Sequence, residues 1–579
     1  MNTILGRLPL LLEIVINGFF VAFYTFHKSK KFPEFVQLFP RERILEVAVW
    51  VVPLVLFITL LTNFLKSDSF DDFIRKYVFS IIIFVPVMIT WGDIEFIYWL
   101  SAVHLFSTFI SIYEKQEKRK KQTRLTSLNN TSNFLFNLKL QPAQVIMLSF
   151  VGVILLGTFV LLLPISTSGA KNLGFMDALF MATSATCVTG LASISVGNDL
   201  SVFGQMVLLV LMQVGGLGIM TISSSMAVIM GRNLQLREQV IMQNVLDTSS
   251  SEELMYLVTD IIKFTFTIEF IGALLLTIGF YQAGFEIGQS IYYGFFHAIS
   301  AFCNAGFALW DNSIFDFKFD PLISNTIMML ITFGGLGFSV IKDILDRLKK
   351  RQSLRTLMLH TKIVLTVHFA MVGIAAMYFF FGEYLNSFED FSLFEKIQVS
   401  FFQSVTIRTA GFTTVDLGLM QPHCLYLAML FMFIGASPGS TGGGVKTTTF
   451  AILLQSVIAT LKGKQYVEFF ERRIPSATVI KSIAIFIISL ITVSAGVLVM
   501  VRLEPDKGFF PIIFEVVSAF GTAGLSLNVS AYLSDLGKFF IALMMYLGRI
   551  GPLTLVLAVG SRVRRKSNVE YPEGKVLIG

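Results

Sequence analysis

The sequence predicts an all-α polytopic membrane protein built on a fourfold pseudo-symmetric repeat. Of its 579 residues, 54% are hydrophobic and only 14% are charged, whereas a soluble domain carries roughly 25% charged residues. Apolar runs of about 20 residues recur along the chain, the length that an α-helix needs to cross a bilayer. A short glycine-containing turn occurs four times, about 105–116 residues apart, and such a period indicates an internal repeat.

The composition also excludes several classes of protein. The net charge of +7 comes from Lys and Arg in short loops, where these residues set membrane topology, so no nucleic-acid partner is expected. Three cysteines (Cys187, Cys303 and Cys424) are too few for a disulfide framework or a Cys-rich metal site. The 59 phenylalanines are expected mainly to face lipid.

Residues 1–113 are expected to form three or four N-terminal transmembrane helices. Lys28, Lys30 and Lys31 follow the first apolar run and favour the cytoplasm. That position suits three spans and one interfacial helix, whereas four spans would place the three lysines outside. Residues 114–139 contain a dense run of Lys and Arg and are predicted to be a basic cytoplasmic linker.

Four pore repeats are predicted after this linker, at 140–240, 241–352, 353–472 and 473–579, the last with a cytoplasmic tail. Each should contain a long apolar helix, a half-length helix, the glycine turn and a second apolar helix. The expected first helices are 143–164, 254–282, 357–382 and 476–502. The expected half-helices are 175–186, 290–302, 393–407 and 509–521. The expected second helices are 202–230, 321–341, 423–460 and 534–560.

The loops between the units are basic, so we expect them in the cytoplasm and the four glycine turns on the outer side. Helices of the half-length kind are too short to span a bilayer. Non-helical backbone at membrane depth is tolerated where it is buried in protein or lines a water-filled cavity. Four such turns around one central pore would form that lining, although four ordinary turns between helices remain an alternative.

The four turns fit an ion-selectivity filter. Glycine adopts positive φ without strain, and a ring of backbone carbonyls can replace the hydration shell of a monovalent cation. The flanking side chains are uncharged, which disfavours a divalent-cation site. The residues expected to bind the ion are Val188, Thr189 and Gly190, Asn304, Ala305 and Gly306, Thr409, Ala410 and Gly411, and Thr522, Ala523 and Gly524.

The second helix of the third unit contains a run of glycines with one proline, the poorest helix formers. The run lies mid-span, beneath the expected filter, and predicts a gate loop that obstructs the pore; a kink without a gating role is the alternative. The expected gate residues are Gly439, Ser440, Thr441, Gly442, Gly443, Gly444 and Lys446, together with Arg549 of the fourth unit.

Two arginines lie near these features. A lone charge at mid-membrane is a functional hypothesis by default, and Arg549 could either hold the gate loop through loop carbonyls or act as an electrostatic barrier to cations. Arg408 adjoins the third turn and could join the ends of half-helices, with Asp177 and Glu515 as candidate partners.

Acidic residues follow three of the turns. Asp199, Asp311 and Asp416 could concentrate cations in an outer vestibule. They could equally cap the helices that follow.

The glycine-rich run resembles a phosphate-binding loop, which requires a lysine directly after its second glycine. Here Val445 follows Gly444. An ATP-driven pump, the alternative from another functional class, is therefore disfavoured, and no enzymatic activity, catalytic residue or organic cofactor is expected.

These motifs resemble one family. The stretch Ser437–Gly444, the four turns, Gly548–Pro552 and the tail Tyr571–Lys575 are similar to the superfamily of K⁺ transporters that comprises TrkH, KtrB and plant HKT proteins. The resemblance covers about 140–579 and looks strongest to bacterial KtrB. The N-terminal helices depart from the KtrB pattern, so the subfamily stays open between KtrB and TrkH.

The resemblance implies a K⁺ uptake subunit of the bacterial cell (inner) membrane, with K⁺ bound at the filter positions given above. It also implies a homodimer with one pore per protomer, and a cytoplasmic nucleotide-binding ring of the KtrA or TrkA type that moves the gate loop. In similar systems Na⁺ promotes K⁺ uptake. A TrkH-type or Na⁺-conducting HKT-like transporter is the alternative within the superfamily.

Overall fold

The computed structural model describes residues 142–168, 173–218 and 251–551, with a few isolated positions nearer the N-terminus. The chain divides into two compact units, Met1–Lys139 and Leu140–Gly579. The helices predicted within 1–113, the linker at 114–139, the end of the helix predicted at 202–230 and the cytoplasmic tail lie outside the described ranges.

The second unit repeats one pattern four times, which confirms the predicted fold class. The first helices are α7 (Pro142–Leu161), α12 (Ser251–Gln282), α16 (Leu359–Gly382) and α20 (Ser476–Leu503). The half-helices are α8 (Phe175–Cys187), α13 (Ile287–Phe302), α17 (Leu393–Thr406) and α21 (Phe509–Gly521). The second helices are α9 (Val202–Leu217), α14 (Pro321–Leu336), α18 (Pro422–Phe433) and α22 (Asp535–Ile550).

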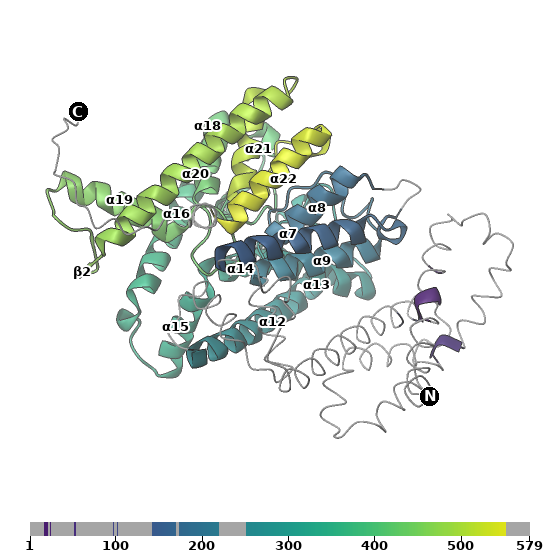
Figure 1. Cartoon of the computed structure of the whole chain (residues 1–579), viewed down its shortest axis with the longest axis horizontal. Coiled ribbons are helices and arrows are strands. Elements are labelled where there is room, and N and C mark those ends of the chain that lie inside the picture. The colour runs from purple at the N-terminus through teal and green to yellow at the C-terminus, as the bar shows by residue number, and fades with distance from the viewer. Residues whose placement is uncertain are drawn as a thin grey trace, which may run out of the picture. The chain divides into compact units, whose positions relative to one another are not determined.

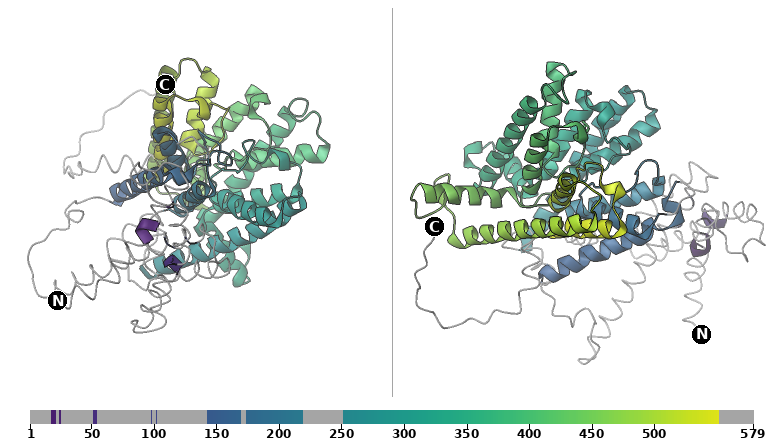
Figure 2. Two further views of the ribbon diagram at one scale, coloured as in Figure 1. Left: turned by 90° about the vertical axis from the view of Figure 1, so that its right-hand side faces the viewer. Right: turned by 90° about the horizontal axis from the view of Figure 1, so that it is seen from above.

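The four repeats follow one another around a common centre. In the left view of Figure 2, the colours run around the body from blue through teal and green to yellow. In Figure 1, α22 of the last repeat lies beside α8 of the first, and the two helices are in contact. The first and fourth repeats therefore meet, and the arrangement closes on itself.

Local sequence signals start several of these helices. Ser201 accepts a hydrogen bond from the Gly204 amide at the start of α9, and Ser534 accepts one from Gly537 at the start of α22. A side-chain oxygen at this position satisfies an amide that has no partner within the helix. Short 3₁₀ turns precede four of the helices: η2 (Pro164–Ser166), η3 (Phe315–Phe317), η5 (Leu417–Leu419) and η6 (Ser530–Tyr532).

Three helices in the described part of the chain are long and apolar enough to cross a membrane. They comprise Thr259–Gln282 within α12, and the whole of α16 and α20. The 13–16 residues of the half-helices are too few to span the roughly 30 Å of hydrocarbon at about 1.5 Å per residue.

The second helix of the second repeat is not continuous, so the helix predicted at 321–341 was wrong. It ends at Leu336, and α15 (Phe338–Lys349) continues at an angle of 100°. Gly337 forms the bend with φ 95°. A Cβ on Gly337 would lie 2.5 Å from the carbonyl oxygen of Pro438, so a segment about 100 residues away in the sequence packs against this bend and leaves no room for a side chain.

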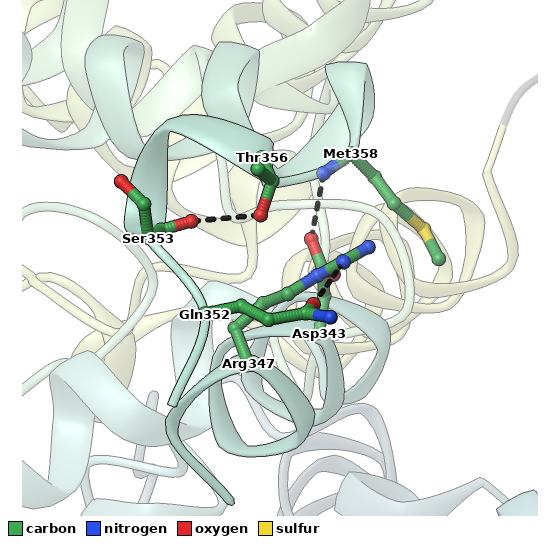
Figure 3. A network of polar contacts seen from close by, with 6 residues as sticks. All are labelled: Asp343, Arg347, Gln352, Ser353, Thr356 and Met358. Atoms are coloured by element: carbon green, nitrogen blue, oxygen red, sulfur yellow. Dashed lines mark hydrogen bonds and ion pairs between the residues drawn. The ribbon is translucent and has the colours of Figure 1, made fainter. Parts of the chain in front are cut away.

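A polar network connects α15 to α16 (Figure 3). Buried Asp343 accepts hydrogen bonds from the Met358 amide at 2.8 Å and from Arg347 Nε at 3.4 Å. The Arg347 guanidinium also donates to Gln352 Oε1 at 2.6 Å. These bonds join the two ends of the connection between the second and third repeats, which includes η4 (Leu354–Thr356), so α15 is anchored to the start of α16.

The second helix of the third repeat is interrupted, as its glycines predict. Helix α18 ends at Phe433, and α19 (Thr447–Leu461) begins after a non-helical segment of residues 434–446. A hairpin that the sequence did not predict follows α19, with β1 (Glu468–Phe469) paired antiparallel to β2 (Arg472–Arg473).

The core is rich in phenylalanine, and the expectation that phenylalanine mainly faces lipid was too simple. The largest fully buried side chains are all Phe: Phe180, Phe280, Phe296, Phe302, Phe307, Phe379, Phe388, Phe402, Phe412, Phe514 and Phe520. Many belong to the half-helices or the segments that directly follow them. These rings therefore fill the space around the turns, while others, such as Phe381 and Phe394, are exposed.

Candidate functional site

The four turns share one backbone conformation. Each half-helix ends near a residue with left-handed dihedral angles, and a glycine with positive φ follows two residues later. The left-handed residues are Val188 (φ 56°), Asn304 (φ 58°), Thr409 (φ 67°) and Thr522 (φ 49°). The glycines are Gly190 (φ 96°), Gly306 (φ 70°), Gly411 (φ 80°) and Gly524 (φ 79°).

Each glycine faces a backbone carbonyl of the next repeat. A Cβ on Gly190 would lie 2.5 Å from Ala305 O, one on Gly306 2.6 Å from Ala410 O, and one on Gly411 3.1 Å from Ala523 O. A Cβ on Gly524 would overlap Thr189 O. The series runs from the first repeat to the fourth and back to the first, so the four turns form a closed ring.

The ring is narrow and uncharged. A Cβ on Gly411 would lie 3.1 Å from the Gly306 Cα and 3.2 Å from the Gly524 Cα, so backbones of three repeats approach one another here. The residues that precede the glycines (Thr189, Ala305, Ala410 and Ala523) are fully buried. An arrangement of converging backbone carbonyls without ionised side chains can coordinate a dehydrated monovalent cation.

Residues 434–446 lie directly against the third and fourth turns. The Gly443 amide donates a hydrogen bond to Thr522 Oγ1 at 3.0 Å, and a Cβ on Gly442 would overlap the Thr409 side chain. The Thr441 hydroxyl donates to Phe302 O at the end of α13, at 3.2 Å. The segment therefore contacts the third and fourth turns and the end of α13.

The same segment also forms backbone hydrogen bonds with the second repeat. The sequence did not predict these bonds. The Ser437 amide donates to Gly335 O at 3.2 Å, and the Thr441 amide donates to Gly334 O at 3.1 Å. In the opposite direction, the Phe338 amide at the start of α15 donates to Gly439 O at 3.0 Å. The glycines at the end of α14 thus hold the loop through their backbone carbonyls.

Arg549 and Lys446 also bind carbonyls of this region. The Arg549 guanidinium donates to Thr441 O and to Gly215 O at the end of α9. Lys446 Nζ donates to Gly442 O at 2.7 Å. Ser440 Oγ donates to Ser437 O at 2.6 Å, and Gly439 and Gly444 adopt φ of 67° and 68°.

The three acidic residues after the turns all accept hydrogen bonds from nearby loop residues. Asp416 accepts from the Gly418 amide at 2.9 Å and caps η5. Asp199 Oδ2 accepts from the Ser195 amide at 2.8 Å. Asp311 accepts from Asn198 Nδ2 at 2.9 Å and from the Ser195 hydroxyl, so it joins the loops that follow the first and second turns.

The partners predicted for Arg408 were wrong. Its guanidinium lies 2.6 Å from His368 Nδ1 of α16. Asp177 instead forms an ion pair with Lys538 at 2.7 Å, and Glu515 accepts hydrogen bonds from Ser526 and Ser530. These partners depend on how neighbouring helices pack, which spacing along the sequence does not specify.

Comparison with known proteins agrees with this architecture. The family model described as TrkH, cation transport protein, matches residues 145–571. The chain is 40% identical over 441 residues to Ktr system potassium uptake protein B of Bacillus subtilis, covering 76% of this chain and 97% of the relative. It is 35% identical over 449 residues to potassium/sodium uptake protein NtpJ of Enterococcus hirae, covering 76% and 98%.

The fold has a solved counterpart. The crystal structure of the potassium transporter TrkH from Vibrio parahaemolyticus aligns with a TM-score of 0.58 at 16% identity, covering 85% of this chain and 97% of that one. The family consists of membrane transporters and not of enzymes. Because the family model and relatives at 35–40% identity cover about three quarters of the sequence, the chain belongs to the TrkH family of cation transport proteins.

Proposed function

We propose that this chain is the membrane pore subunit of a K⁺ uptake system. The observation that carries the proposal is the closed ring in which each turn glycine faces a carbonyl of the next repeat. A family of cation transport proteins and relatives named for potassium uptake support the choice of ion.

The ring would act as a selectivity filter. K⁺ would exchange its hydration water for backbone carbonyls of the residues that end at Gly190, Gly306, Gly411 and Gly524. No ionised side chain stands among these residues, which favours a monovalent ion over a divalent one. Asp311, whose carboxylate lies on the exposed outer loops, would attract cations toward the entrance, with Asp199 and Asp416 adding negative charge.

The segment 434–446 would be the gate. It lies next to two of the turns and is held by hydrogen bonds to Gly334, Gly335 and Thr522. Glycine-rich backbone can change conformation at low cost. Arg549 would hold the closed loop, because its guanidinium donates to the Thr441 carbonyl.

The basic loops set the proposed orientation of the chain in the membrane, and the membrane potential sets the direction of K⁺ flow. The basic connections between repeats favour the cytoplasm, which places the turns outside and the C-terminus inside a bacterial cell membrane. K⁺ would then enter passively, driven by the membrane potential at about 2.3 kcal/mol per 100 mV.

The assembly is proposed from the family resemblance. The chain would form a homodimer with one pore in each protomer. A cytoplasmic nucleotide-binding ring of the KtrA or TrkA type would control the gate loop. The strongly amphipathic α15 ends with Arg347 and Lys349 and offers a basic surface on the side where such a ring would bind.

A second candidate is a transporter that also passes or requires Na⁺. The name of the relative from Enterococcus hirae includes both potassium and sodium, and each repeat contributes one short turn in place of a longer filter loop. Fewer ordered ion sites would discriminate less strictly between the two ions.

Uptake of radioactive Rb⁺ by cells that lack their own K⁺ uptake systems tests the proposal. The chain should confer uptake that K⁺ inhibits more strongly than Na⁺. Purified protein in liposomes should show the same flux without ATP under an imposed potential. A chain that reaches the membrane but confers no Rb⁺ uptake contradicts the proposal, and equal inhibition by Na⁺ favours the second candidate.

A further inference from the structure

Side chains of each half-helix form hydrogen bonds with the turn that follows it. We propose that Ser184, Ser300 and Thr406 are positioning residues of the ion filter, and that Ser518, at the corresponding place in the fourth repeat, is not. This inference rests on the proposed filter and adds residues that line no part of the ring.

Three hydroxyls in the last turns of half-helices reach the backbone at or just beyond the glycine. Ser300 Oγ donates to Phe307 O at 2.8 Å, and Thr406 Oγ1 donates to Phe412 O at 2.6 Å. Ser184 Oγ accepts from the Gly190 amide at 3.1 Å. Each hydroxyl thereby links the half-helix to its turn, at the glycine in the first repeat and one residue beyond it in the second and third.

The fourth repeat has a hydroxyl at the same distance from its glycine as the first and second repeats, but this hydroxyl does not form the corresponding hydrogen bond. A hydroxyl lies six residues before the glycine in the first, second and fourth repeats and five before it in the third. Ser518 is as buried as the other three, yet within the described part of the chain its Oγ has no hydrogen-bond partner.

A carboxylate braces the fourth turn instead. Glu515, one turn before Ser518, accepts hydrogen bonds from Ser526 Oγ at 2.7 Å and from Ser530 Oγ, both beyond Gly524. His297 has the same register in the second repeat, where its Nε2 accepts from the Leu309 amide at 3.4 Å. Every turn is therefore hydrogen-bonded to its own half-helix, but only in the first three repeats does the half-helix supply a hydroxyl for the bond.

These hydrogen bonds matter because a carbonyl filter selects by the spacing and field of its oxygens. A turn that lacks this hydrogen bond can relax around a smaller ion. The preference for K⁺ over Na⁺ then falls, while the pore stays open. A neutral hydrogen bond contributes about 1 kcal/mol, which corresponds to roughly a fivefold change in an equilibrium constant.

The test measures inhibition of Rb⁺ uptake by K⁺ and by Na⁺ in liposomes, normalised to purified protein. Thr406→Val keeps the side-chain shape and removes the hydroxyl. Ser184→Ala and Ser300→Ala remove the corresponding hydroxyls of the first and second repeats. Each should lower the K⁺ over Na⁺ preference by about threefold to tenfold. Thr406→Ser should restore it, and Ser518→Ala should match the wild type.

Several results overturn the inference. If the three hydroxyl variants keep the wild-type preference, or lose maximal uptake without a change in preference, the side chains serve packing alone. If Ser518→Ala changes the preference as much as they do, the hydrogen bonds are not the cause. Gly411→Ser in the same assay tests the proposed filter separately from the positioning residues. An unchanged preference for K⁺ over Na⁺ in that variant refutes the filter itself.

Discussion

The amide of Gly443 donates a hydrogen bond to the hydroxyl of Thr522 at 3.0 Å. Gly443 belongs to the interrupted helix of the third repeat, and Thr522 is the left-handed residue of the fourth turn. One bond thus joins the proposed gate loop to the proposed filter. Because both groups are buried, loop opening must either expose this amide to water or find it another acceptor.

Thr522→Val should raise flux by favouring the open loop. The variant leaves the buried Gly443 amide without its acceptor, at a cost of about 1–3 kcal/mol to the closed state, or roughly a 5- to 140-fold shift in the equilibrium between the closed and open loop. Valine fits the backbone, because Val188 occupies the equivalent position of the first turn with φ 56°, against 49° for Thr522. Rb⁺ flux into liposomes without a regulatory partner measures the effect.

Thr414→Val is the matched control. Thr414 is also fully buried, and its hydroxyl has no hydrogen-bond partner among the residues that the structure describes. The same change in shape should therefore leave flux at the wild-type level. Equal flux in Thr522→Val and the wild type would mean that this bond does not hold the loop closed.

Arg549 allows its two proposed roles to be separated. To hold the gate loop, Arg549 needs a planar guanidinium that reaches Thr441 O and Gly215 O together. To act as an electrostatic barrier to cations, it needs only its positive charge. Lysine keeps the charge but not the planar guanidinium. The contacts favour the role of holding the gate loop, so Arg549→Lys and Arg549→Gln should both raise flux at least about tenfold. A Lys variant that conducts like the wild type beside a leaky Gln variant would support the barrier.

Gly190→Ser should reduce K⁺ selectivity. The new Cβ would lie 2.5 Å from Ala305 O, so the first and second turns must separate and their carbonyls lose their spacing. Gly284→Ser provides the control, since Gly284 has a similar φ of 99° but nothing within 4 Å of a Cβ. Both variants carry comparable backbone strain, and only Gly190→Ser should lower the ratio of K⁺ to Na⁺ inhibition of Rb⁺ uptake. An unchanged ratio would contradict the filter assignment.

The repeat was predictable because each of its parts is local. Half-helix length, a glycine three to five residues after the helix end and a polar residue before the next helix can each be recognised in a short stretch of sequence, and four copies reinforce one another. The bend at Gly337 was not predictable, because the segment packed against it, at Pro438 and Gly439, lies about 100 residues away in the sequence. The His368 partner of Arg408 is equally non-local. The sequence shows only that residue 337 is a glycine, and the fold shows that it packs against Pro438.

Lys538 and Asp177 close the seam between the fourth and first repeats. Their ion pair joins α22 to α8 at 2.7 Å, with side chains only 11% and 24% exposed. Partial burial strengthens a charge-assisted hydrogen bond, so a double-mutant cycle of Lys538→Met and Asp177→Asn should give a coupling energy of about 1–3 kcal/mol in the free energy of unfolding. Thermal unfolding in detergent measures it.

The Lys464–Glu468 pair is the comparison for this cycle. It has a similar distance of 2.9 Å but lies on the exposed hairpin connection, with side chains 51% and 46% exposed. Solvent screens such a pair, and its coupling should not exceed about 0.5 kcal/mol. If the two cycles give the same small coupling, the Lys538–Asp177 pair does not stabilise the seam. The closure of the ring would then depend on the packing of α22 on α8, on the contact of Gly524 with Thr189 O and on the other hydrogen bonds between these repeats, such as that from Arg549 to Gly215 O.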